Sequence, residues 1–506
     1  MTSPAEKLAE SLERLKKLQD RGIIAIQSSD LTRTHRERLV KNGFLQEVIK
    51  GWYIASRQDE SAGESTAWYA SYWGFCAVYL NRRFGDHWCL SPEQSISLHA
   101  GNWTVPQQLL VRSPKANNQV TSLPYKTSLL DVQLSMPNKN EVEIKNGLRI
   151  FSLASALVTC PPKFFIQNPT DVRTALLLIP DASDVLDLLL SDGRSKIASR
   201  LVGAFRHIGR SQFADEIIKT MTTVGYDVRE INPFAVTPIH LHFSRERSPY
   251  VNRMRIQWQE MREVIIKHFP APVVRQKNPD KYLKAVDDAY MMDAYNSLSI
   301  EGYRVSEQLI HRVRSGVWNP DNNLDDREHI AALAARGYWL AFRAVKKSLR
   351  RVLKNVNPGK VFDEDHRDWY REMFAPCVTA GILKPADLAG YRRGPVYIRH
   401  SMHVPPDPSA VRDLMPVLSE LLTQETESAV RIVLGHFFFV YIHPYMDGNG
   451  RMGRFLMNVM CAAGGYPWII IPVEKRNQYM AALESASVVR NILPFCQFLR
   501  ELVESV

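Results

Sequence analysis

The sequence lacks any run of apolar residues long enough to cross a bilayer, although 45% of its 506 residues are hydrophobic. Its N-terminus, Met1 to Lys7, also lacks the basic segment followed by an apolar segment that marks a secretory signal. We therefore expect a cytoplasmic protein without a membrane partner, whose apolar residues fill the cores of two to four domains.

Cysteine is scarce, and its six occurrences are scattered without Cys-x-x-Cys spacing. This pattern predicts neither a zinc site nor a disulfide framework, and reduced thiols are expected. Charge is more abundant, with 64 Lys and Arg against 53 Asp and Glu and a net charge of +11. The excess favours polyanionic partners, but a basic nucleotide-binding protein reaches the same balance, so charge alone decides little.

Residues 1–58 contain a succession of short helical and strand patterns. Apolar residues at helical spacing predict a helix over residues 5–19, and residues 25–43 predict a short helix, a turn and a second helix. Residues 44–55 alternate like a hairpin that turns near Lys50-Gly51. Three helices and a hairpin predict a winged helix-turn-helix.

The last of these three helices is the candidate recognition helix, because it carries Arg33, Arg36 and Arg38. A DNA reader needs such donors for phosphates and base edges. The alternative is a winged helix that serves only protein contacts. We therefore expect these three arginines to bind DNA, and protein contact is the alternative.

The hydrophobic order of Leu39 to Tyr53 and of Leu90 to His99 resembles the AbiEi-type antitoxin and transcriptional regulator family. This resemblance implies a mixed α/β regulatory domain over residues 59–240. Strand-like stretches at 107–112 and 147–152 agree with it. Residues 241–278 are basic and interrupted by prolines, which predicts a connector with a helix of its own.

A loop between two helical patterns carries the clearest chemistry. Residues 429–442 are too long and too apolar for a strand and predict a buried helix, which Pro444 ends or kinks, so His443 lies where helix gives way to loop. Gly448 and Gly450 allow positive φ around Asn449, and the loop can turn its N–H groups inward as an anion nest. The next helix points its free N-terminal donors at the same place.

The residues around this nest suit phosphate and a divalent cation. Arg451 and Arg454 share one face of the second helix and can clamp phosphates. Asp447 adds a carboxylate suited to Mg²⁺, and His443 is a nearby base. The alternative is a glycine-rich corner between two helices, with a satisfied histidine and surface arginines.

The stretch from His443 to Arg454 resembles the Fic family signature, H-P-[FY]-x-[DE]-G-N-G-R-x-x-R. The resemblance implies that His443 takes the proton of a target hydroxyl, that Asp447 holds Mg²⁺ and that AMP is transferred from ATP to a protein. It also implies that the nucleotide phosphates are bound by Gly448, Asn449, Gly450, Arg451 and Arg454.

A second motif lies at the end of the helix predicted over residues 280–300. Ser297-Leu-Ser-Ile-Glu301-Gly302 resembles the Fic inhibitory motif, in which the glutamate pairs with the last arginine of the signature and obstructs the γ-phosphate. A carboxylate at a helix C-terminus also seeks a cation, and Arg454 is available. The alternative is an ordinary helix end.

Residues 390–406 interrupt the helical pattern, contain Val396, Tyr397 and Ile398, and end at Pro405-Pro406, which predicts a β-hairpin. The stretch resembles the Fic flap, which adds a target segment as an extra strand beside the active site. The expected fold is therefore multidomain, with a winged helix-turn-helix, an α/β domain and an all-α Fic domain with a β-hairpin flap over residues 279–506.

Two functions of different classes stay open. The first is a Mg²⁺-dependent adenylyltransferase, inhibited by Glu301, that acts on a Ser, Thr or Tyr hydroxyl of a protein, itself included, or that removes AMP by the reverse reaction. The second is a DNA-binding transcriptional regulator or antitoxin-like protein that uses the pocket as a nucleotide sensor. The intact His443 and Asp447 favour the enzyme, and a homodimer is compatible with both.

Overall fold

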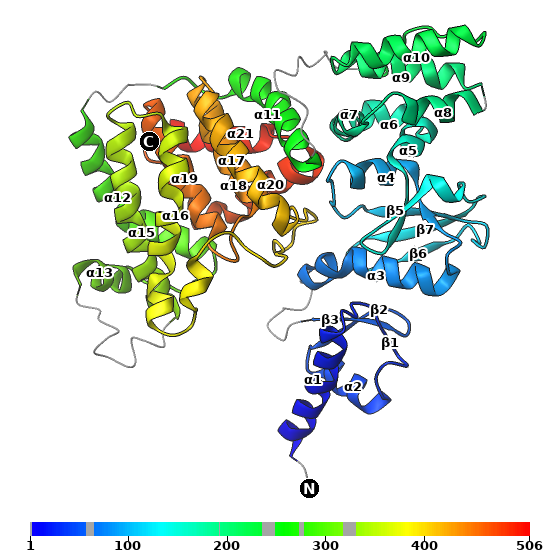
Figure 1. The fold of residues 1–506 in the computed structure, drawn as a ribbon. Coiled ribbons are helices and arrows are strands. Elements are labelled where there is room, and N and C mark those ends of the chain that lie inside the picture. The colour runs from blue at the N-terminus through cyan, green and yellow to red at the C-terminus, as the bar shows by residue number, and fades with distance from the viewer. Residues whose placement is uncertain are drawn as a thin grey trace. The chain divides into compact units, whose positions relative to one another are not determined.

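The computed structural model describes residues 3–56, 65–191, 193–234, 248–272, 278–316 and 330–505 (Figure 1). The chain divides into two compact units, one of Met1–Ile256 with Tyr397–Val404 and the other of Gln257–Val396 with Pro405–Val506. Within the expected connector, residues 241–247 and 273–277 lie outside the described residues, and α11 is a helix over Pro249–His268.

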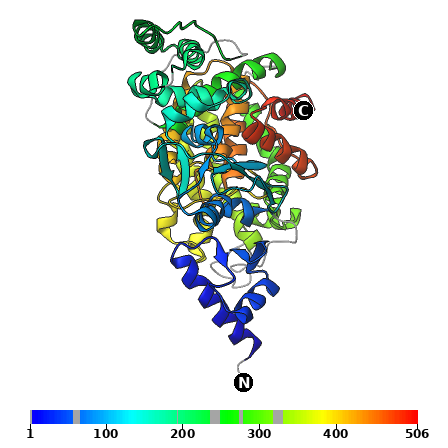
Figure 2. The same ribbon diagram turned by 90° about the vertical axis from the view of Figure 1, so that its right-hand side faces the viewer.

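The N-terminal part of the first unit pairs two helices with a small sheet, as the blue end of the chain shows (Figures 1 and 2). The helices are α1 (Pro4–Asp20) and α2 (Arg33–Lys41), and Ser3 with Glu6 forms a capping box that begins α1. The antiparallel sheet has the order β1-β3-β2, with strands Ile26–Gln27, Trp52–Ala55 and Leu45–Ile49.

The predicted hairpin is confirmed, because β2 and β3 pair across Lys50-Gly51 and Gly51 has a φ of 81°. The short helix predicted after residue 25 is wrong. Ile26 pairs with Tyr53 as part of β1 and is fully buried in the core that α1 and α2 cover. Burial of a β-branched residue against the sheet outweighs the local helical pattern.

The rest of the first unit is mixed α/β, as predicted. Its four-stranded sheet has the order β4-β5-β7-β6, in which β5 (Gln108–Ser113) and β7 (Ser128–Gln133) are parallel, and β8 and β9 form a separate hairpin. The remaining strands are β4 (Cys89–Leu90), β6 (Val120–Ser122), β8 (Val142–Lys145) and β9 (Leu148–Phe151). The helices are α3 (Thr66–Phe84), α4 (Pro92–His99), α5 (Leu153–Thr159), α6 (Pro162–Gln167), α7 (Pro169–Leu178), α8 (Ser183–Ser191), α9 (Ser195–His207) and α10 (Ser211–Thr223).

The second unit is helical, and no strand occurs among the residues of it that the structure describes. Its centre is the antiparallel pair α18 (Ser428–Ile442) and α19 (Asn449–Gly464), which are buried along almost their whole length. The surrounding helices are α12 (Pro279–Ile300), α13 (Glu307–Ser315), α15 (Ile330–Val352), α16 (Pro358–Thr379), α17 (Pro408–Gln424), α20 (Arg476–Glu484) and α21 (Leu493–Glu504).

The β-hairpin predicted for residues 390–406 is not formed, and this segment is irregular throughout. Val396 belongs to the second unit, whereas Tyr397 and Ile398 belong to the first. In the first unit, Met402 O accepts a hydrogen bond from Val105 N at 3.0 Å, and Met402 and Val404 pack on the apolar cluster around α3. The Met402 carbonyl is therefore bonded to Val105 and not to a partner strand of a hairpin.

No helix within the described ranges combines the length and the apolar character that a membrane span requires.

Candidate functional site

The loop between α18 and α19 begins at His443, which ends α18 in the left-handed conformation with a φ of 53°. A non-glycine residue in this region is strained and needs support from its surroundings. The buried Arg392 provides it, because its Nε donates to His443 O at 2.7 Å and its backbone N donates to Pro444 O at 2.9 Å. The position of the histidine backbone is thus set from outside the signature.

The imidazole of His443 is held in one tautomer. Its Nδ1 lies 3.1 Å from Val440 O, and because a carbonyl oxygen only accepts, Nδ1 carries the proton. Burial lowers the pKa of His443 to about 4, and the charge of Arg392 acts in the same direction. The ring is therefore neutral near pH 7 and presents the lone pair of Nε2, as a general base requires.

The loop is closed by Asn449. Its Oδ1 accepts from Tyr445 N at 2.9 Å and its Nδ2 donates to Tyr445 O at 2.8 Å, and the side chain is buried. The expected nucleotide contact therefore falls to the backbone of Asn449, since the amide group is used inside the loop.

The start of α19 offers free backbone donors. Gly448 precedes the helix with a φ of 80°, and the first helical bond runs from Met452 N to Gly448 O at 2.9 Å. The N–H groups of Asn449, Gly450 and Arg451 come before this first bond and lack an acceptor within the helix. This end of α19 therefore favours an anion.

Asp447 and Arg451 lie beside this end. The Asp447 side chain is 62% exposed, and its two oxygens accept from Gly448 N at 2.6 Å and from Arg451 Nη2 at 3.1 Å. The guanidinium of Arg451 is buried between the rings of Tyr303 and Phe374, each 5.2 Å from it. Its Nε has no hydrogen-bond partner within the described part of the chain, so this cation has capacity left for a ligand.

The residues at this end of α19 fit a Mg²⁺ ion that is held by one carboxylate. Among the described residues, no group of three or more His, Cys, Asp or Glu forms a metal cage. Mg²⁺ commonly binds through one carboxylate, waters and substrate phosphates, and the exposed oxygens of Asp447 next to the anion site meet that requirement.

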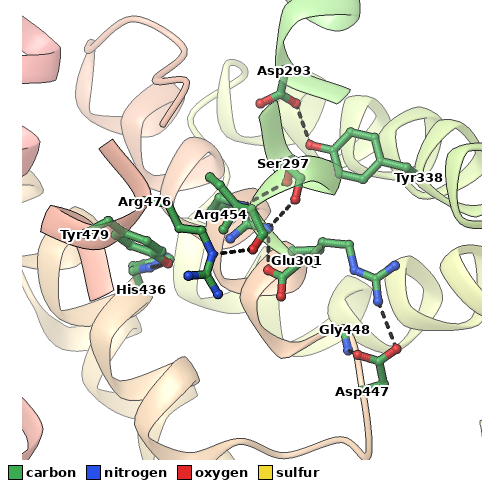
Figure 3. A network of polar contacts seen from close by, with 12 residues as sticks. Asp293, Ser297, Glu301, Tyr338, His436, Asp447, Gly448, Arg454, Arg476 and Tyr479 are labelled. Atoms are coloured by element: carbon green, nitrogen blue, oxygen red, sulfur yellow. Dashed lines mark hydrogen bonds and ion pairs between the residues drawn. The ribbon is translucent and has the colours of Figure 1, made fainter. Parts of the chain in front are cut away.

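Arg454 is engaged by α12, as predicted (Figure 3). Its Nη2 donates to Glu301 Oε1 at 2.7 Å and to Ser297 O at 3.0 Å, and its Nε donates to Ser297 Oγ at 2.8 Å. The expected contact between Glu301 and Arg454 is therefore present, and Ser297 belongs to the same contact.

The carboxylate of Glu301 also lies against the anion site. A Cβ atom added at Gly450 would lie 2.3 Å from Glu301 Oε1, so only glycine leaves room for the carboxylate here. Glu301 ends α12, and Gly302, with a φ of 90°, turns the chain away. The carboxylate thus lies over the first turn of α19. It occupies the position in which a bound phosphate is expected.

A cavity of about 990 Å³ adjoins the loop and is lined by Asp447 and Arg451 together with Tyr303, Tyr370 and Phe374. Its volume is that of a typical ligand pocket. The sequence did not indicate three residues that support the site, which are Tyr303, Arg392 and Arg476. Arg476 Nε donates to Ile300 O at 2.8 Å at the end of α12. The three residues come from separate helices and loops, and no local pattern marks them.

The three arginines expected to bind DNA are not equally available. Arg33 pairs with Glu37 at 2.6 Å on the surface. Arg36 Nη1 donates to Ser28 O at 2.8 Å, and Arg38 Nη1 donates to Lys7 O at 2.7 Å. DNA binding stays a prediction, with Arg38 the least available of the three.

Residues 363–461 match the sequence model of the Fic/DOC family. The chain is 30% identical over 225 residues to the protein adenylyltransferase Fic of Drosophila willistoni and 32% identical over 225 residues to that of Drosophila mojavensis. Each alignment covers 44% of this chain and 41% of the relative, so the chain spans about two fifths of the length of these curated relatives. Among solved structures, Fic-1 (aa134–508) from C. elegans has a TM-score of 0.36 and 17% identity over 70% of this chain and 88% of that chain.

Proposed function

We propose that this chain is a protein adenylyltransferase that transfers AMP from ATP to a Ser, Thr or Tyr hydroxyl of a protein target, itself included. The observation that carries the proposal is the neutral imidazole of His443 beside an anion site made by the start of α19. The match to the Fic/DOC family and the names of the relatives support the same reaction.

The chemistry follows from the roles of these groups. The target hydroxyl oxygen forms a bond to the α-phosphorus of ATP, the bond from that phosphorus to the bridging oxygen breaks, and pyrophosphate leaves with the electron pair. His443 Nε2 takes the hydroxyl proton as the bond forms. The donors at the start of α19 and the guanidiniums of Arg451 and Arg454 hold the phosphates. Asp447 would hold Mg²⁺, which would neutralise charge on the phosphates.

The resting site is closed by Glu301. Its carboxylate pairs with Arg454 and lies against Gly450, so a phosphate and Glu301 compete for the same donors. The protein is therefore autoinhibited. Removal of AMP by the same pocket is the alternative direction, in which Glu301 orients an attacking water instead.

Intact mass measurement after incubation with ATP and Mg²⁺ tests the proposal. We expect the protein to gain the mass of AMP, most clearly in a Glu301→Gly variant, and the gain to be absent when His443 is also replaced by Ala. A gain of phosphate mass instead would contradict adenylylation and indicate a kinase. Adding candidate target proteins tests for a protein partner, and adding DNA to the wild type and to variants of the N-terminal arginines tests for a DNA partner. Gel filtration tests for the expected homodimer.

A further inference from the structure

One face of α12 carries a line of polar side chains that leads to the inhibitory contact. Asp293, Ser297 and Glu301 are spaced by four residues and therefore lie on the same side of the helix (Figure 3). Asp293 and Ser297 are 4% and 2% exposed, so both are buried beneath the surface that Glu301 reaches. The proposed inhibition involves Ser297 and Glu301 but not Asp293.

Asp293 is held by a tyrosine of α15. The hydroxyl of Tyr338 donates to Asp293 Oδ2 at 2.6 Å, and the phenol ring is fully buried. Burial and the Asp293 carboxyl raise the pKa of Tyr338. The hydrogen bond between Tyr338 and Asp293 ties α15 to α12 one turn before Ser297. The Tyr338 ring also packs against Phe455, the neighbour of Arg454 in α19, with ring centroids 4.8 Å apart.

Arg454 depends on this support. Two of its three nitrogens donate to Ser297, and the third, Nη1, has no hydrogen-bond partner within the described part of the chain. A buried guanidinium with an unused donor is directed mainly by the groups that do hold it. Ser297 therefore sets the direction in which Arg454 meets Glu301, and the bond between Tyr338 and Asp293 fixes the turn of α12 that precedes Ser297.

We propose that Asp293 and Tyr338 are positioning residues that hold Ser297 and Arg454 in the geometry that Glu301 closes, so that they determine how completely the resting site is shut. This inference rests on the proposed function, because it assigns the regulation of the same site. Both residues are buried and act through Ser297.

The test is a double-mutant cycle with Glu301→Gly, because a residue that acts through Glu301 loses its effect once Glu301 is gone. We expect Tyr338→Phe to raise the rate of AMP transfer about 3- to 10-fold when Glu301 is present, as loss of the hydrogen bond to Asp293 implies. In the Glu301→Gly background the same change should alter the rate less than about 2-fold. Asp293→Asn, which keeps the size of the side chain, should show the same dependence on Glu301.

Tyr282→Phe is the matched control, because Tyr282 is also buried on α12 and its hydroxyl has no hydrogen-bond partner within the described residues. It should leave the rate unchanged in both backgrounds. Equal effects of Tyr338→Phe and Asp293→Asn with and without Glu301 would show a merely structural role and overturn the inference. No effect of either variant when Glu301 is present would overturn it as well.

Affinity for ATP with Mg²⁺, measured by calorimetry on the same variants, separates this inference from the proposed function. If no variant transfers AMP, the proposed function fails. The inference is then supported by an affinity gain of Tyr338→Phe that requires Glu301, and overturned by an affinity change that is the same in both backgrounds.

Discussion

Replacing Glu301 with Gly should open the anion site at the start of α19. Glu301 Oε1 and Arg454 Nη2 are 2.7 Å apart, with side chains 27% and 4% exposed. A hydrogen bond to a charged group contributes about 1.5–3 kcal/mol, and the partial exposure of the carboxylate places this pair near the lower figure. About 1.5 kcal/mol corresponds to roughly a tenfold shift toward the open site, so we expect about a tenfold higher rate of AMP transfer.

Initial rates of label transfer from α-labelled ATP at constant Mg²⁺ measure this effect. Glu307→Ala is the control, because Glu307 begins α13 in the same segment and makes no ion pair within the described residues, and its rate should equal that of the wild type. Glu301→Gly combined with Arg454→Ala should lose much of the gain, because the freed guanidinium is what binds phosphate.

The removal of AMP from a modified protein is measured in parallel. In an enzyme that works mainly in reverse, Glu301→Gly would stop removal, since the carboxylate would then orient the water. Unchanged rates in both directions would refute the reasoning and make Glu301 an ordinary helix-end residue.

Three further predictions concern the same site, and a fourth concerns the N-terminal part of the chain. His443→Ala should lower transfer by about 10²–10⁴-fold while ATP binding stays, because the base acts on the incoming hydroxyl; undiminished transfer would exclude this role. Asp447→Ala should raise the Mg²⁺ concentration needed for half-maximal transfer, and an unchanged Mg²⁺ titration would remove Asp447 from the metal site. Because the pKa of His443 is lowered to about 4, its neutral form persists as the pH falls from about 7 to 5 and is lost as the pH passes about 4; an initial-rate profile that falls near pH 6.5 would contradict the assignment. Duplex DNA binding should weaken with salt and with Arg33→Ala and Arg36→Ala, and equal gel mobility of these variants and the wild type at low salt would leave the N-terminal part with protein contacts only.

The sequence by itself determined the loop chemistry of this protein. His443 to Arg454 are adjacent in the chain, so a helix end, two glycines and a helix start place them together without help from distant residues. The helical period likewise predicted α12 and its end at Glu301, and the unfavourable position of a carboxylate at a helix C-terminus indicated a cationic partner.

Only the tertiary structure decided what these elements meet. The contact between Glu301 and Arg454 spans 153 residues of sequence, and the closeness of Glu301 to Gly450 depends on how α12 packs on α19. The same holds for residues 390–406, whose hairpin pattern gives way because the backbone of Met402 bonds to Val105, and for Ile26, which joins a sheet instead of a helix. A local sequence pattern indicates the backbone conformations that a short segment prefers. Burial and long-range hydrogen bonds then select one of these conformations. The residues that supply this burial and these hydrogen bonds lie elsewhere in the chain, so the segment's own sequence does not identify them.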